Sequence, residues 1–135
     1  MGRYKTLSKS NPYYLPKHYY RHAISWCLQY PEWIKELDTD PDTSKAIDYS
    51  KDKVQTSNNY DATYEIAVRR MELATKKKLL EDTIREVDES IFKYLILGLA
   101  YGFTVYQLKD RGMPCDNKYY YNRKQHVLYL INQRT

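Results

Sequence analysis

Helical spacing of apolar residues runs through the first third of the chain. Apolar and aromatic positions 20, 23, 24, 27 and 28 recur one helical turn apart, and Trp33, Ile34 and Leu37 follow in a second short stretch. Pro16 and Pro31 stand where helices commonly begin. The pattern predicts an N-terminal helical pair over residues 17–29 and 31–37, preceded by a basic arm.

A longer periodic segment follows a polar one. Residues 38–60 are rich in Asp, Ser, Thr and Asn with little periodicity, which indicates a linker, partly disordered. Residues 62–86 contain no Gly or Pro, and Asp61 can cap their start, which predicts a long helix. One side carries Ile66, Arg70, Leu73, Lys77, Leu80, Ile84 and Val87. Basic residues interrupt this stripe, so the helix is expected to cross the globular part or to pair with a copy of itself.

The last third has the clearest start and stop signals. Asp88 can cap a strongly apolar helix over 89–101. Thr104 and Gln107 have the spacing of a capping box for a short helix over 105–110, which Gly112 and Pro114 would end. Asp116 can cap the final helix over 116–132. The sequence therefore predicts an all-α chain divided into 1–37, 38–60 and 61–135, with a three-helix, helix-turn-helix unit at its end.

The final helix is expected to have a packing side and a polar side. The packing side carries Tyr120, Arg123, Val127, Leu130, Ile131 and Arg134. Polar and aromatic side chains elsewhere on the helix can reach phosphates and base edges. The candidate DNA-binding residues are Asn117, Lys118, Tyr121, Asn122, Lys124 and Gln125. A plain helical hairpin with a solvated polar face is the alternative.

Charge favours an acidic partner, with double-stranded DNA the first candidate. The chain has a formal net charge of +5. Six basic residues and two acidic ones after position 103 carry +4 of it. Residues 1–22 contain basic residues and no acid, so they either follow DNA phosphates or form a solvated terminus. Sixteen tyrosines suit half-buried surfaces and interfaces, or fill the core.

Chemistry that would indicate an enzyme is not evident. Cys27 and Cys115 lack metal-ligand spacing and are expected to be reduced thiols, and Cys115 is more readily explained as structural than as reactive. His18 and His22 lie one turn apart without a third ligand. No Gly-rich phosphate loop occurs, and neither a cofactor nor a metal is expected. Without an apolar leader or a stretch long enough to cross a bilayer, we expect a cytoplasmic protein of a bacterial host, not bound to membrane.

Three segments resemble a group of small phage and prophage proteins. These segments are Asn11 to Tyr20, Cys27 to Trp33, and Met113-Pro114-Cys115 followed by Tyr119, Tyr120, Arg123 and Leu130. The C-terminal half is similar to late-gene transcription regulators of the RinA and ArpU type. The resemblance implies a sigma-like helix-turn-helix, with residues 104–109 as the supporting helix and 116–125 as the reading end. Aromatic residues at positions 119–121 depart from the small and basic residues usual there.

Three functions remain open from the sequence. The first is a DNA-binding transcription regulator. The second is a module that binds a protein, such as host RNA polymerase or a defence enzyme, through its tyrosines. The third is the recognition subunit of a DNA-packaging machine. A homodimer is expected, because two-fold partners double the contacts of a helix-turn-helix, with the long helix or the N-terminal helical pair as the interface.

Overall fold

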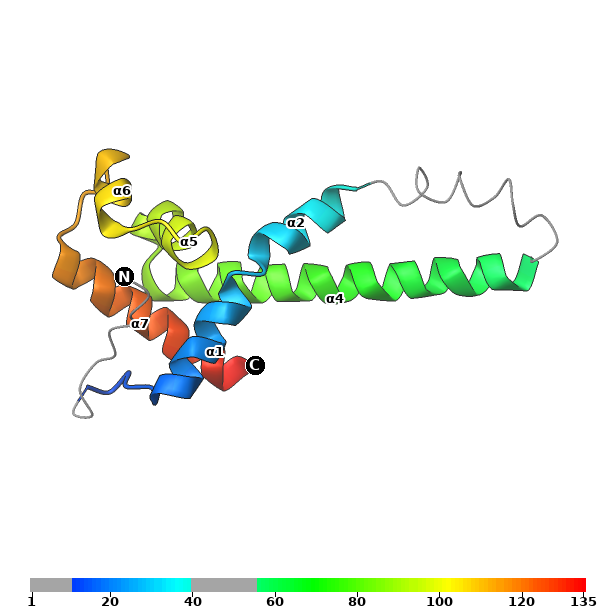
Figure 1. The fold of residues 1–135 in the computed structure, drawn as a ribbon, viewed down its shortest axis with the longest axis horizontal. Helices are drawn as coiled ribbons and strands as arrows, with labels where there is room; N and C mark the ends of the chain where they lie inside the picture. The colour runs from blue at the N-terminus through cyan, green and yellow to red at the C-terminus, as the bar shows by residue number, and fades with distance from the viewer. Residues whose placement is uncertain (1–10, 40–55) are drawn as a thin grey trace. The chain divides into compact units, whose positions relative to one another are not determined.

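The fold is built from helices. The computed structural model describes residues 11–39 and 56–135, with the side chains of the long helix described from residue 62 onward. Its elements are α1 (Lys17–Cys27), α2 (Tyr30–Asp38), α4 (Thr56–Asp88), the 3-10 turn η1 (Glu89–Ile91), α5 (Phe92–Ala100), α6 (Val105–Asp110) and α7 (Asn117–Arg134) (Figure 1). No strand occurs in these two ranges, and the predicted all-α class is confirmed.

The helix boundaries depart from the prediction mainly in the long helix. Helix α4 begins at Thr56, six residues before the expected start, so residues 56–60 belong to a helix and not to the linker. Asp61 therefore lies inside α4 and does not cap it. Helix α1 ends at Cys27, and α2 begins at Tyr30 with Pro31 in its first turn, where the missing amide hydrogen costs nothing. The rest of the predicted linker, residues 40–55, lies outside the described residues.

The chain divides into two units, each with its own packing. The described part of the first unit comprises residues 11–31 and 79–135, and the second comprises residues 32–78. In the first unit α1 packs on α5 and α7, and α5 packs on α6 and α7. The core of this unit is formed by fully buried side chains from these helices and from the end of α4: Cys27, Leu80, Thr83, Ile84, Leu95, Leu99, Leu108, Tyr120, Val127, Leu128 and Ile131. The C-terminal end of α4 therefore belongs to this core.

Helices α5 and α7 approach closely at Gly98. A Cβ atom placed on Gly98 would lie 1.8 Å from the Tyr120 hydroxyl oxygen and 3.6 Å from Cδ1 of Leu108. The hydroxyl end of Tyr120, a residue that is 1% exposed, thus occupies the space that a side chain at position 98 would take. Position 98 consequently sets how tightly α5, α6 and α7 pack.

In the second unit, α4 is tied to the end of α2 by arginine. The Arg70 guanidinium donates to the carbonyl oxygens of Glu36, Leu37 and Thr39 at 3.3, 2.7 and 3.2 Å, so it satisfies acceptors that the end of a helix leaves open. Arg69 donates from Nε to the Glu36 carboxylate at 2.6 Å. Arg70, which seemed to interrupt the apolar stripe, therefore has a structural role there.

Within residues 11–39 and 56–135, none of the helices combines the length and the apolar character that crossing a bilayer requires.

Candidate nucleic-acid interface

The segment from Thr104 to Asp116 is held by local signals that the sequence predicted. The Gln107 amide N–H donates to Thr104 Oγ1 at 3.2 Å, and the Thr104 amide N–H donates to Gln107 Oε1 at 2.8 Å, which completes the capping box of α6. At the other end, Gly112 has φ +98°, a left-handed conformation that costs glycine little. The start of α6 and the turn after it are therefore defined.

The turn that leaves α6 is a Schellman motif. The Met113 amide donates to the Leu108 carbonyl at 3.1 Å, and the Gly112 amide donates to the Lys109 carbonyl at 3.0 Å. Met113 and Leu108 are both buried, and they occupy the two positions where this motif commonly has apolar residues. The chain then reaches Asp116, whose Oδ1 accepts from the Tyr119 amide at 2.9 Å and caps α7. These bonds fix where α7 begins.

The first two turns of α7 present most of the predicted DNA-binding residues to solvent. Asn117, Lys118, Tyr121 and Asn122 are all exposed. The orphan amide groups and the positive end of the helix dipole lie at the same end, which favours anionic groups such as phosphates. This end of α7 can therefore offer amide, ammonium and aromatic groups to a partner together.

Gln125 was wrongly predicted as a base-reading residue. Its side chain is only 3% exposed, and its Nε2 donates to the Tyr13 carbonyl oxygen at 3.0 Å. An amide used in this buried hydrogen bond is not available to a base edge. Lys124, also predicted to contact DNA, is half-buried, and burial lowers the pKa of its ammonium while the nearby Cys27 acts to raise it. Its position inside the packing argues against a phosphate contact.

The segment before α1 covers the middle of α7. The ring of Tyr13 stacks on His126, with ring centroids 4.0 Å apart, and meets Tyr129 edge-on at 5.7 Å. Together with the Gln125 hydrogen bond, these contacts place residues 11–15 over α7 beyond its second turn. The predicted basic arm comprises the first eleven residues, of which residues 1–10 lie outside the described residues. The covered stretch separates the exposed residues of the first two turns of α7 from the exposed residues at its C-terminal end.

The positive charge of the C-terminal segment is smaller at the surface than its residue count suggests. Arg134 pairs with Glu86 at 3.0 Å and also donates to Thr83, and Arg123 lies 3.4 Å from the Asp88 carboxylate. The three basic residues of this segment that remain exposed, apart from the paired Arg134, are Lys109, Arg111 and Lys118. Lys109 lies in the last turn of α6, Arg111 directly after that helix, and Lys118 in the first turn of α7.

Asp88 organises the side of α7 that faces the end of α4. The Tyr119 hydroxyl donates to Asp88 Oδ2, and the Arg123 guanidinium stacks over the Tyr119 ring at 4.7 Å. Burial acts to raise the pKa of Asp88, but hydrogen bonds from Ser90 and Tyr119 outweigh it and hold that pKa below its ordinary value. Tyr119 and Arg123 are thus engaged within the fold.

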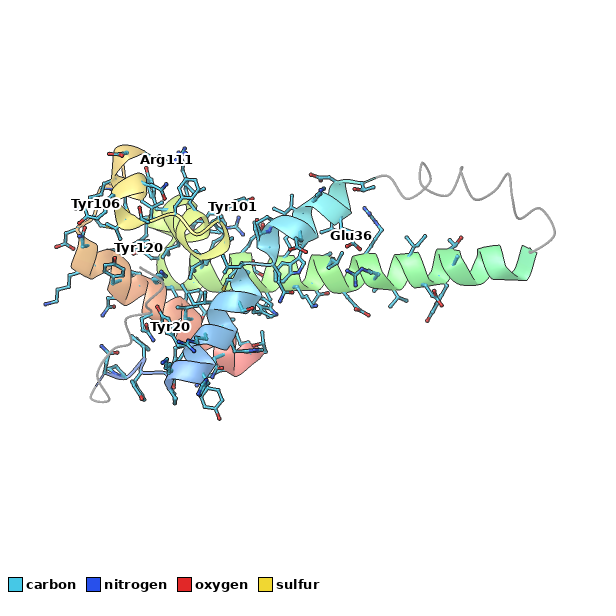
Figure 2. All side chains as sticks on the ribbon, viewed as in Figure 1. Tyr20, Glu36, Tyr101, Tyr106, Arg111 and Tyr120 are labelled. Atoms are coloured by element: carbon cyan, nitrogen blue, oxygen red, sulfur yellow. The ribbon has the colours of Figure 1, made fainter. Side chains whose placement is uncertain are left out.

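Exposed aromatic residues form part of this surface that the candidate set largely omitted. Tyr106 on α6 is 80% exposed, while Tyr119 and Tyr121 on α7 are 39% and 45% exposed. Tyr106 projects from α6, and Arg111 directly follows the last residue of that helix (Figure 2). A signal for Tyr106 was present in the sequence, because a helix capped at Thr104 that buries Val105 and Leu108 must turn position 106 outward.

Both cysteines have raised pKa values in the structure. Burial raises the pKa of Cys27 to about 12 and also raises the pKa of Cys115, the opposite of an activated thiol. Within the part of the chain that the structure describes, no three His, Cys, Asp or Glu side chains are grouped so that they could hold a metal ion.

Comparison with known proteins does not assign this chain to a family. No protein-family model, no curated protein and no solved structure matches it.

Proposed function

We propose that the chain is a DNA-binding transcription regulator of phage origin, which inserts the start of α7 into the major groove. The observation that carries this proposal is the exposure of Asn117, Lys118, Tyr121 and Asn122 on the first two turns of α7. Helix-turn-helix proteins contact bases with the N-terminal residues of their second helix. The resemblance of the C-terminal half to RinA and ArpU-type regulators supports the same function.

The proposed contacts divide into two kinds. Asn117 and Asn122 read base edges, because a carboxamide can make paired hydrogen bonds with adenine. Lys118 at the start of the helix contacts a phosphate. Lys109 and Arg111 near the end of α6 are also exposed and contact neighbouring phosphates. Gln125 and Lys124 have no part in these contacts, since Gln125 is buried and Lys124 is half-buried.

A mobility-shift assay on fragments of the genome that encodes the chain tests the proposal at two salt concentrations, roughly 50 and 200 mM. We expect one fragment to be retained at the higher salt. Asn122→Ala should weaken its binding by about 1–3 kcal/mol without affecting other fragments. Lys118→Ala should weaken all fragments and reduce the salt slope by about 1. Gln133→Ala and Lys35→Ala remove an exposed amide and an exposed lysine elsewhere and serve as matched controls.

Two outcomes would contradict the proposal. One is that no fragment is retained at either salt concentration, and the other is that Asn122→Ala and Lys118→Ala bind as the parent chain does. Transcription in vitro from the retained fragment then separates regulation from packaging, because a recognition subunit for DNA packaging would leave transcript levels unchanged.

Protein docking is the second candidate, and the exposed tyrosines favour it. Tyr106, Tyr119 and Tyr121 present three partly exposed rings, a composition typical of protein interfaces. Host RNA polymerase is the partner to try first. If the chain retains polymerase but no DNA fragment, and Tyr106→Ser abolishes the retention, the docking function replaces the DNA-binding one.

A further inference from the structure

A stripe of α4 in the second unit presents apolar side chains to solvent. Tyr64, Val68, Met71 and Thr75 follow one another at intervals of four, three and four residues, the spacing of a coiled-coil seam. Tyr64 is 66% exposed and Met71 is 69% exposed, and the stripe lines a shallow hollow of about 630 Å³. The side of α4 that carries Leu73, 3% exposed, is by contrast buried. The stripe is therefore a second, separate apolar face.

We propose that this stripe binds the same stripe of a second copy of the chain, with the two α4 helices antiparallel. In the register that centres the seam, Val68 of each helix lies opposite Met71 of the other, and Tyr64 lies opposite Thr75. The seam is about 17 Å long at 1.5 Å per residue, which is short for a coiled coil. The dimer should accordingly be weak and depend on concentration.

The charges beside the stripe are the reason for an antiparallel arrangement. One flank carries Glu65, Arg69, Glu72 and Lys76, so acidic and basic residues alternate along it. Antiparallel helices bring this flank against its own copy, with Glu65 near Lys76 and Glu72 near Arg69, each pair two positions from level in that register and within reach of long side chains. Arg69 also pairs with Glu36 of its own chain at 2.6 Å, so the Glu65–Lys76 pairs at the two ends of the interface carry the charge argument.

The other flank of the stripe leads to the same arrangement. It carries Ala67 and Ala74, both exposed. In an antiparallel pair, Ala67 of each helix lies against Ala74 of the other. Small side chains there allow the two helices to approach closely, because interaxial distance depends on the side chains at the contact. A parallel pair would instead place the charged flank of one helix against the alanine flank of the other, so Glu65 and Glu72 would have no basic residue opposite them.

The first test is the mass of the full chain in solution, and it does not depend on DNA binding. Light scattering over roughly 5–200 μM should show the mass rising from 16.3 kDa towards twice that value. Met71→Glu should keep the chain monomeric at all these concentrations, while Met71→Leu should dimerise as the parent does. Circular dichroism should show the same helix content in all three. A parent chain that stays monomeric at 200 μM overturns the proposal and leaves a different protein as the candidate partner of the stripe.

Charge reversal in two separate chains tests the antiparallel pairing. Lys76→Glu and Glu65→Lys each place like charges together at both ends of a homodimer, so each chain alone should dimerise at least fivefold more weakly than the parent. Mixed in equal amounts, the two variants should form a heterodimer of about parental affinity, because positions 65 and 76 are then both acidic in one chain and both basic in the other. Effects within one helix cannot produce this recovery. Equal weakness alone and mixed overturns the proposed orientation.

A disulfide test checks the register. With Cys115 replaced by serine, a chain carrying Val68→Cys should cross-link on oxidation to a chain carrying Met71→Cys, in preference to its own copy. Predominant cross-linking of Val68→Cys chains to one another would indicate a parallel pair and overturn the proposal.

Discussion

The first two turns of α7 and its later turns are similar in sequence but differ in what surrounds them. Both contain amide and basic side chains, such as Asn122 and Lys118 in the first part and Gln125 and Lys124 in the second. Residues 117–119, 121 and 122 are exposed, whereas Gln125, Val127, Leu128 and Ile131 are buried beneath α1 and residues 11–15. The comparison shows that residue type alone does not assign a binding role. Substitutions in the later turns should change stability, and substitutions in the early turns should change binding.

The largest effect is expected from Ile131→Ala. Ile131 is fully buried, so its truncation removes apolar burial and leaves a cavity, at a cost of about 2–5 kcal/mol in the free energy of unfolding. Urea denaturation followed by circular dichroism measures this cost. Lys118→Ala, at the exposed end of the same helix, should change the unfolding free energy by less than about 0.5 kcal/mol. Similar losses for both variants would contradict the division of α7.

Gly98→Ala should also destabilise the fold. Alanine would gain up to about 1 kcal/mol in helix propensity, but its Cβ would lie 1.8 Å from the Tyr120 hydroxyl. Overpacking of this kind costs about 1–3 kcal/mol, so a net loss is expected in thermal and urea unfolding.

Tyr120→Phe provides the matched partner for that experiment. The Tyr120 hydroxyl is buried and has no hydrogen-bond partner among the described residues, so its removal should leave stability unchanged or raise it. Combined with Gly98→Ala it should recover part of the loss, because the nearest remaining atom is Cζ at 3.1 Å. Purely additive effects would contradict the steric explanation.

Gln125→Ala distinguishes the two parts of α7 most directly. It removes the hydrogen bond to the Tyr13 carbonyl and should lower the unfolding free energy by about 1 kcal/mol. DNA affinity of the folded protein should remain that of the parent, whereas Asn122→Ala should show the reverse pattern. If Gln125→Ala instead weakened DNA binding at unchanged stability, Gln125 would belong to the binding surface after all.

The smallest effect concerns the pH dependence of His126. Burial, with Arg123 as a further cause, lowers the pKa of His126 below its ordinary value of 6.5, so the unfolded chain binds this proton more readily than the folded one. Its contribution to stability is fully present above pH 6.5 and is lost as pH falls from that value through the lower pKa of the folded state. His126→Phe keeps a ring against Tyr13 but does not titrate, and the change in its unfolding free energy between pH 7.5 and 5.5, measured with urea, should be smaller than in the parent.

Local signals account for most of the fold that could be predicted. The caps at Asp88, Thr104 and Asp116 and the left-handed Gly112 depend on side chains that bond to backbone within a few residues, so they can be read directly. The start of α4 at Thr56 could not, because the Ser57, Asn58 and Asn59 that follow it favour caps and turns. The apolar period of that helix begins only after these residues.

The candidate site also has features that local patterns predict and features that depend on long-range contacts. Local patterns were sufficient to predict the helical class, the turn between α6 and α7 and the outward direction of Lys118, Tyr121 and Asn122, because helical periodicity and capping act over a few residues. The burial of Gln125 was decided by long-range packing, through Tyr13, which lies 112 residues away in the chain. The pairing of Arg123 with Asp88 and of Arg134 with Glu86 was decided in the same way. Contacts at such separations depend on how the helices pack, and no local pattern contains that information.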